Sequence, residues 1–276
     1  MKNILVPIDF SKKSEFASKM AARIAKKSNS VVYLLHIIEL PTGVVDMGPA
    51  SSFSIPESML YLRKIRERIL EFKNNFFSKN TQVHYAIKLQ TPYEGILKYA
   101  DKINADLIVM GYKGQSEFEE IIIGSNTEKV VRTAKVPVIV VKKDNEKFRM
   151  KNLIFASSFK NEDKKEVFRK FLEFANHFDS TIHLLKVNTP SKFESTQEAT
   201  EKIETFIEGF VLPKYSINIY NDALIEKGIL NFANNIDADL IALSTSGRTG
   251  LSHLFSASVT KSLSKKALKP ILTIRV

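Results

Sequence analysis

An internal repeat constrains the fold of this chain more than any other feature. The segment GILKYADKINADLI, Gly95–Ile108, recurs as GILNFANNIDADLI, Gly228–Ile241, with nine of fourteen positions identical. Near the start, KNILVPIDF from Lys2 aligns with KNLIFASSF from Lys151. Repetition at a fixed offset indicates duplicated structural units. The sequence therefore predicts two copies of one domain.

Within the first copy, short apolar runs alternate with stretches of helical periodicity. The expected strands are Asn3–Ile8, Val31–Ile38, Val83–Lys88, Asp106–Met110 and Pro137–Lys142, and the expected helices are 11–27, 54–76, 92–103 and 125–133. This alternation predicts a parallel sheet with right-handed crossovers. We expect an α/β fold of two repeated doubly wound domains, residues 1–143 and 151–276, each with a five-stranded parallel sheet flanked by helices.

The two copies differ in length, and a polar run separates them. The insertion PTGVVDMGPASSFSIPE occurs only in the first copy, and Lys142–Lys151 is the expected linker. The fifth strand of each domain is expected to be a sheet edge, which invites pairing unless it is covered. We therefore expect the two domains to pack against each other within one chain, with a homodimer as a further form of assembly.

Composition excludes several classes of protein. The 276 residues are 44% hydrophobic, which is enough for a sizeable core, and they contain no Cys for disulfides or thiolate metal sites. No apolar run has transmembrane length and no signal peptide is recognised, so the expected location is the cytoplasm. The net charge is +11, but basic and acidic residues are interleaved, so nucleic-acid binding is not expected. The basic residues of the second expected helix, Arg63, Lys64, Arg66 and Arg68, are interpreted as a solvated face.

A glycine-rich loop follows the fourth expected strand. Gly111, Gly114 and Gly124 have the spacing G-x2-G-x9-G, and Ser125 then begins a helix. Glycine lets a backbone approach a phosphate, and a helix N-terminus favours an anion. The same loop could be only a tight turn. Lys113 could likewise contact phosphate or simply be solvated.

Ligands of doubly wound sheets bind at the carboxyl ends of strands, near a switch in strand order. Asp9 ends the first strand and could contribute a carboxylate there or cap the following helix at Ser11. His36, at the end of the second strand, is interpreted as a core or rim residue. No phosphate loop, dinucleotide fingerprint, zinc-binding helix motif or nucleophile elbow is present, so no catalytic residue is assigned.

These residues resemble the universal stress protein family, whose nucleotide-binding members carry G-x2-G-x9-G-[ST] after the fourth strand and an aspartate after the first. The resemblance covers nearly the whole chain as a tandem pair, and it implies an adenine nucleotide alpha hydrolase-like fold that binds ATP with Mg²⁺. It places Pro7, Asp9 and Ile37 beside adenine and ribose, and Met110 and Gly111 beside the sugar. It places Gly114, Gly124, Ser125 and Asn126 beside the phosphates.

The second copy departs from this pattern. The aspartate is replaced by Ser158 and the proline by Ala156, and two of the three glycines become Ser244 and Ala257, while Gly247 and Ser258 persist. Added Cβ atoms and a missing carboxylate should each weaken nucleotide binding. We therefore expect the second domain to bind nucleotide poorly or not at all.

Three functions follow from these observations. The favoured one is an ATP-binding stress-response or signalling module with nucleotide in the first domain. The alternative is an interaction scaffold of the same fold that needs no nucleotide. An enzyme, such as a slow ATPase or a nucleotidyl-group transferase, would require a positioned base or nucleophile that the sequence does not identify.

Overall fold

The computed structural model describes residues 1–39, 55–112, 125–144, 149–160, 163–245 and 269–275. The first half contains strands β1 (Asn3–Ile8), β2 (Val31–Ile38), β3 (Val83–Leu89), β4 (Leu107–Gly111) and β5 (Val138–Val141), and helices α1 (Lys12–Ser28), α2 (Ile55–Phe76), α3 (Pro92–Lys102) and α4 (Ser125–Thr133). The second half contains strands β6 (Asn152–Ala156), β7 (Thr181–Asn188), β8 (Tyr215–Asn221), β9 (Leu240–Thr245) and β10 (Ile271–Arg275), with helices α5 (Asp163–Ala175), η1 (Pro190–Lys192), α6 (Thr196–Ile207) and α7 (Ile225–Asn235).

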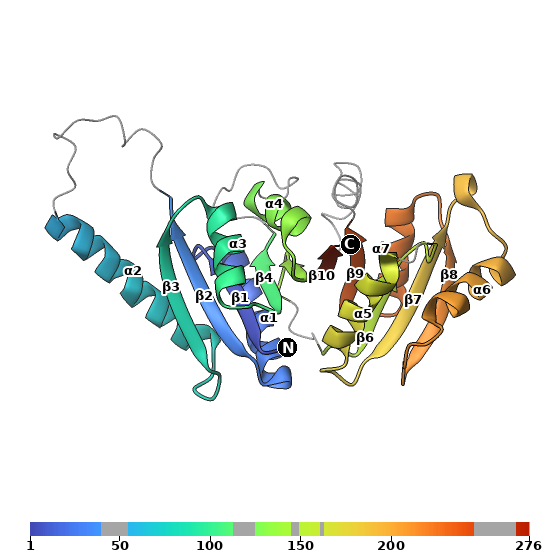
Figure 1. Ribbon diagram of the computed structural model, residues 1–276, viewed down its shortest axis with the longest axis horizontal. Helices are drawn as coiled ribbons and strands as arrows, with labels where there is room; N and C mark the ends of the chain where they lie inside the picture. Colours follow the sequence, from blue (N-terminus) through green and yellow to red (C-terminus); the bar gives the residue numbers. More distant parts are fainter. Residues whose placement is uncertain (40–54, 113–124, 145–148, 161–162, 246–268, 276) are drawn as a thin grey trace.

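The strand order confirms the predicted fold class. The described strands form one sheet in the order β3-β2-β1-β4-β5-β10-β9-β6-β7-β8. Followed from its outer strand inward, each half has its third, second, first, fourth and fifth strands in turn. All neighbouring strands within a half are parallel. Figure 1 shows the two halves side by side, the first coloured blue to green and the second yellow to red.

Helices cover both faces of the first half of the sheet. Met20 and Ile24 of α1 and Ile69 of α2 share one core with strand residues such as Val6. Ile96 of α3 and Val130 of α4 pack in a second core on the other side of the sheet. The chain thus crosses from one face of the sheet to the other between α2 and α3. The strand order therefore switches between β1 and β4, where the carboxyl ends of the strands leave room for a ligand.

The repeated aspartates have the same structural task in both halves. Asp106 Oδ2 accepts a hydrogen bond from the Asn3 amide at 2.8 Å, tying the start of β4 to β1. Asp239 Oδ2 accepts one from the Asn152 amide at 3.1 Å, tying β9 to β6. The carboxylates satisfy amide groups that the strand ladders leave unpaired. The repeat is thus preserved where it fixes the fold.

The repeated glycines allow a helix to approach a strand. A Cβ at Gly95 of α3 would lie 2.7 Å from Ile37 Cδ1, and one at Gly228 of α7 would lie 2.5 Å from Val187 Cγ1. Ile37 is in β2 and Val187 is in β7, at equivalent places. Close helix–strand contact therefore explains why the segment begins with glycine in both copies.

The halves meet at β5 and β10, which pair antiparallel. Ile271 lies opposite Val140, and Thr273 lies opposite Val138. The Thr273 hydroxyl, which is buried, donates to the Val138 carbonyl at 3.2 Å. This junction leaves β3 and β8 as the outer strands of the described sheet.

Candidate functional site

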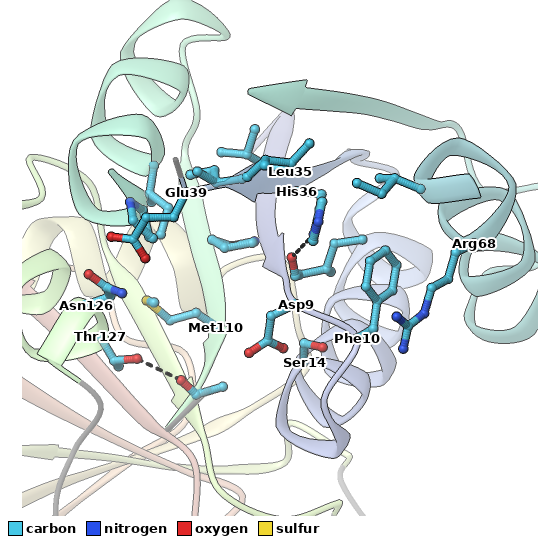
Figure 2. Close-up of a pocket in the computed structure, with 18 of the residues that line it drawn as sticks. Asp9, Phe10, Ser14, Leu35, His36, Glu39, Arg68, Met110, Asn126 and Thr127 are labelled. Carbon is cyan, nitrogen blue, oxygen red and sulfur yellow. Dashed lines mark hydrogen bonds between the residues drawn. The ribbon is translucent and has the colours of Figure 1, made fainter. Parts of the chain in front are cut away.

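A pocket of about 850 Å³ opens at the carboxyl ends of β1, β2 and β4. Its size falls within the range of ligand sites in proteins. Seven of the nine residues predicted from the sequence line it, namely Pro7, Asp9, Ile37, Met110, Gly111, Ser125 and Asn126. They come from three strand ends and one helix start, and Figure 2 shows labelled members facing a common space. The other two, Gly114 and Gly124, lie outside the described residues, as do Lys113 and the second-half residues Gly247, Ala257 and Ser258.

Asp9 combines the two roles that the sequence left open. Its Oδ1 accepts hydrogen bonds from the Ser11 amide at 3.0 Å and the Ser11 hydroxyl at 2.6 Å. Ser11 is the N-cap of α1, where its side chain accepts from the Ser14 amide. The carboxylate also lines the pocket, near Met110 in Figure 2. The hydrogen bonds therefore hold an acidic group in place at the switch point.

Gly111 lines the pocket and also has a packing task that was not predicted. A Cβ at this position would lie 2.8 Å from the backbone carbon of Lys13, so the glycine allows α1 to pack against β4. The Cβ direction is toward α1, and the prediction that a side chain here would obstruct a phosphate is corrected accordingly. The Gly111 carbonyl accepts a hydrogen bond from Thr127 Oγ1 at 3.0 Å, which joins the end of β4 to the first turn of α4.

The first turn of α4 forms the polar side of the pocket. Ser125 is the first helical residue, and Asn126 and Thr127 follow it along the lining. The first amides of a helix have no partner within the helix and carry the positive end of its dipole. This side of the pocket is therefore suited to an anionic group.

The pocket also has an apolar lining. Pro7, Leu35, Ile37, Ile96 and Met110 contribute to it. Such a lining suits the flat face of an aromatic ring, and the adjacent carboxylate and helix amides offer both acceptors and donors. The pocket can therefore hold a ligand with an apolar ring at one end and a negative charge at the other.

His36 lies at the rim, as the sequence predicted. Its Nδ1 donates to the Ile8 carbonyl at 2.9 Å, and its ring lies 4.7 Å from that of Phe10, centroid to centroid. Burial lowers the pKa of His36, while Asp9 opposes the shift and Arg68 adds to it. The imidazole is therefore held neutral near pH 7.

Sequence reasoning missed the side of the pocket formed by α2. Tyr61, Lys64, Ile65 and Arg68 line it, and Phe10 and Glu39 contribute from the strand ends. The four α2 residues are spaced three and four positions apart, which places them on one face of the helix. The sequence could not show that this face lines the pocket. All four basic residues of the helix are exposed, as predicted, but Lys64 and Arg68 also line the pocket.

Comparison with known proteins gives the family. A sequence model of the universal stress protein family matches residues 1–142 and 225–275, which is more than half of the chain. The chain belongs to the universal stress protein family.

Curated relatives and solved structures agree with this assignment. A universal stress protein of Methanocaldococcus jannaschii is 32% identical over 142 residues, covering 51% of this chain and 82% of that protein. The stress response protein NhaX of Bacillus subtilis is 26% identical over 160 residues, covering 50% of this chain and 96% of that protein. The crystal structure of a universal stress protein from Archaeoglobus fulgidus matches 99% of this chain and 96% of its own with a TM-score of 0.66, and its 18% identity supports the fold alone.

The second half of the sheet has a different carboxyl edge. Lys186 of β7 occupies the register position that His36 has in β2, and it pairs with Glu194, which follows η1. Lys160 and Lys202 pair with the same carboxylate at 2.7 and 2.9 Å. Hydrogen bonds from the three lysines, Lys160 first, lower the pKa of Glu194 to about 2. One carboxylate thus pairs with three cations at this edge.

The described residues contain neither a metal-binding cluster of acidic, Cys or His side chains nor a membrane-spanning helix. Across the described residues, no group of three or more His, Cys, Asp or Glu side chains is placed to hold a metal ion. Within the same part of the chain, no helix is both long and apolar enough to cross a bilayer.

Proposed function

We propose that this universal stress protein binds ATP in the pocket of its first half and acts as a stress-response or signalling module. The observation that carries the proposal is the convergence of seven predicted residues on one pocket at the switch point. The domain boundaries at residues 143 and 151, and a cytoplasmic location, belong to the same proposal.

The pocket offers a chemical match for each part of the nucleotide. The apolar wall of Pro7, Ile37 and Met110 would contact adenine. The Asp9 carboxylate would accept hydrogen bonds from the base or the ribose hydroxyls, because it is already held in position by Ser11. The first amides of α4 would donate to phosphate oxygens. Mg²⁺ would accompany the phosphates through their own oxygens and water, which suits an ion that usually retains several waters.

The second half does not offer the same match. Ala156 and Ser158 replace the proline and aspartate, and the Lys186–Glu194 pair lies where His36 lies in the first half. Asp9 has no counterpart with a carboxylate there. We therefore propose one nucleotide per chain.

The experiment is calorimetric titration of the purified chain with ATP and Mg²⁺, with cAMP and adenosine as comparison ligands. These ligands share the base and differ in phosphate number, so their affinities separate recognition of adenine from recognition of phosphate. Binding of ATP to folded protein supports the proposal. No heat at millimolar ATP, with the protein shown to be folded by circular dichroism, would reject it.

A nucleotide-independent scaffold is the second candidate. It is favoured by the structural tasks of Asp9 and Gly111, since the Ser11 hydrogen bonds and the α1 packing would preserve both residues without any ligand. The same titration decides between the two functions.

A further inference from the structure

The pocket extends past the residues assigned to the nucleotide. Figure 2 places Asn126 and Glu39 on one side of Asp9, and Phe10 and Arg68 on the other. Tyr61, Lys64 and Arg68 of α2 line this second side. The region between Asp9 and α2 therefore belongs to the pocket without contributing to the ATP assignment.

The charges on α2 are arranged in two different ways. On the outward face, Arg63 Nε lies 3.1 Å from Glu67 Oε1, the favourable spacing of four residues. On the pocket face, Lys64 and Arg68 have the same spacing with like charge, an arrangement that destabilises a helix. Among the described residues, no ion pair offsets the charge of either side chain.

Aromatic packing orients one of these cations. The Arg68 guanidinium lies over the Phe10 ring, 4.3 Å from its centroid. Phe10 is in turn held between His36 and the ring of Phe72, whose centroid is 5.8 Å away. A guanidinium stacked on a ring keeps its N–H edge available for a planar or tetrahedral oxyanion.

Phe10 is itself held in an uncommon backbone conformation. Its φ is 63°, in the left-handed region that residues other than glycine seldom adopt. The equivalent Phe159 has a φ of 54°, so the turn is a feature of the repeat. Phe159 is buried and packs on Phe206, whereas Phe10 supports a cation at the pocket. At equivalent positions, the second half thus has a buried core aromatic, whereas the first half has a partly buried aromatic that also contacts a cation.

We propose that Lys64 and Arg68 form a second phosphate-binding subsite on the α2 side of the pocket. It would receive either the phosphate chain of the bound nucleotide or the phosphate group of a separate ligand. The subsite does not depend on the ATP assignment, because its two cations and their aromatic support stand apart from the α4 helix start.

The test uses Lys64→Gln/Arg68→Gln in the full chain, with Arg66→Gln as the matched control. Arg66 is an exposed basic residue of the same helix that does not line the pocket. The probe is inorganic tripolyphosphate, titrated into protein with and without saturating ATP. Equal melting temperatures of the variants would show that folding is unchanged.

We expect the double variant to bind tripolyphosphate, ATP or both about tenfold more weakly, the loss expected for charge-assisted hydrogen bonds, with the control unchanged. Tripolyphosphate binding that persists beside ATP assigns the subsite to a separate ligand. If tripolyphosphate and ATP exclude each other, and the double variant binds ATP more weakly but adenosine as before, the subsite binds the nucleotide's own phosphates. Equal affinities in the double variant and the control, or no binding of either probe to the wild type, would overturn the inference. Absence of ATP binding alone rejects only the proposed function.

Discussion

At the scale of residues, the site is built from side chains that also hold the fold together. Asp9 fixes the start of α1 through Ser11, and Thr127 ties α4 to Gly111. Local sequence features predicted Asp9, Gly111 and Ser125 as site residues, because a strand end and a helix start can be recognised locally. The resemblance to the family supplied Pro7, Ile37, Met110 and Asn126. Neither source predicted that Gly111 serves helix packing, because this depends on where α1 lies against β4.

Protonation of His36 should lower the stability of the fold. Burial lowers the pKa of His36 below its usual value of 6.5, so the unfolded chain takes up its proton at a higher pH than the folded chain does. The contribution of a neutral His36 is complete above pH 6.5, and it is lost as pH falls from there through the lowered folded pKa.

The measurement is the free energy of unfolding in urea at about pH 7.5 and about pH 5.5, on either side of the usual titration of histidine. Wild type should lose more stability between these values than His36→Gln does. His177 and His183, whose pKa values are also lowered by burial, remain in both proteins and cancel in the comparison. Equal losses would show that His36 does not contribute.

At the scale of elements, sequence periodicity located the strands and helices well. The first two strands coincide with the prediction, and the fourth begins and ends one residue later than predicted. What periodicity could not give is the orientation of the exposed face of α2. That face depends on the angle at which the helix crosses the sheet, which is set by Ile65, Ile69 and Phe72 in the core.

Replacing three glycines by alanine should give graded losses of stability. At Gly95 the added Cβ meets the ends of two flexible side chains, Ile37 Cδ1 at 2.7 Å and Gln90 Oε1 at 3.1 Å. Because both ends can move and helix propensity gains about 0.5–1 kcal/mol, the change should be near neutral. At Gly228 it meets the stiff branched Val187, and at Gly111 it meets the Lys13 backbone, which cannot rotate away. In urea unfolding, the loss in free energy of unfolding should be smallest for Gly95→Ala, larger for Gly228→Ala and largest for Gly111→Ala, where it should reach about 1–3 kcal/mol. The reverse order would refute the packing argument.

The Glu194 cluster should stabilise the second half. Lys186 is only 4% exposed, so Glu194→Gln leaves a buried cation without its counter-ion. The expected loss in free energy of unfolding is about 3 kcal/mol at neutral pH. Because the pKa of Glu194 is lowered to about 2, the loss should disappear as pH falls from 4.5 through that value. Glu204→Gln, at an exposed position of α6, is the control, and equal stability of the two variants would contradict the prediction.

At the scale of the whole molecule, one sheet runs through both halves. The β5–β10 junction is antiparallel while every other described pairing is parallel, so the halves meet at equivalent strands. The internal repeat predicted two similar units and their fifth strands. The register of the junction could not be predicted, because it is set by side chains of both units, such as Thr273 against Val138.

Breaking this junction should uncouple the halves. Thr273 is 2% exposed, and Thr273→Asp would place a carboxylate against the Val138 carbonyl without a partner. Scanning calorimetry should show one transition for the wild type and two for this variant. Thr273→Ser keeps the hydroxyl and should retain a single transition. A single transition in the aspartate variant would mean that the halves are coupled elsewhere.

We expect the first half alone to bind the nucleotide, and the number of ATP molecules bound per chain is the measurement that decides this. Calorimetric titration with ATP should give one site per chain in the wild type and in Ser158→Asp, which restores only the carboxylate of the second half. Asp9→Ser should weaken binding by about 1–3 kcal/mol, roughly tenfold to a hundredfold in Kd, with folding checked by its melting temperature. Two sites per chain, or unchanged affinity in Asp9→Ser, would contradict the account.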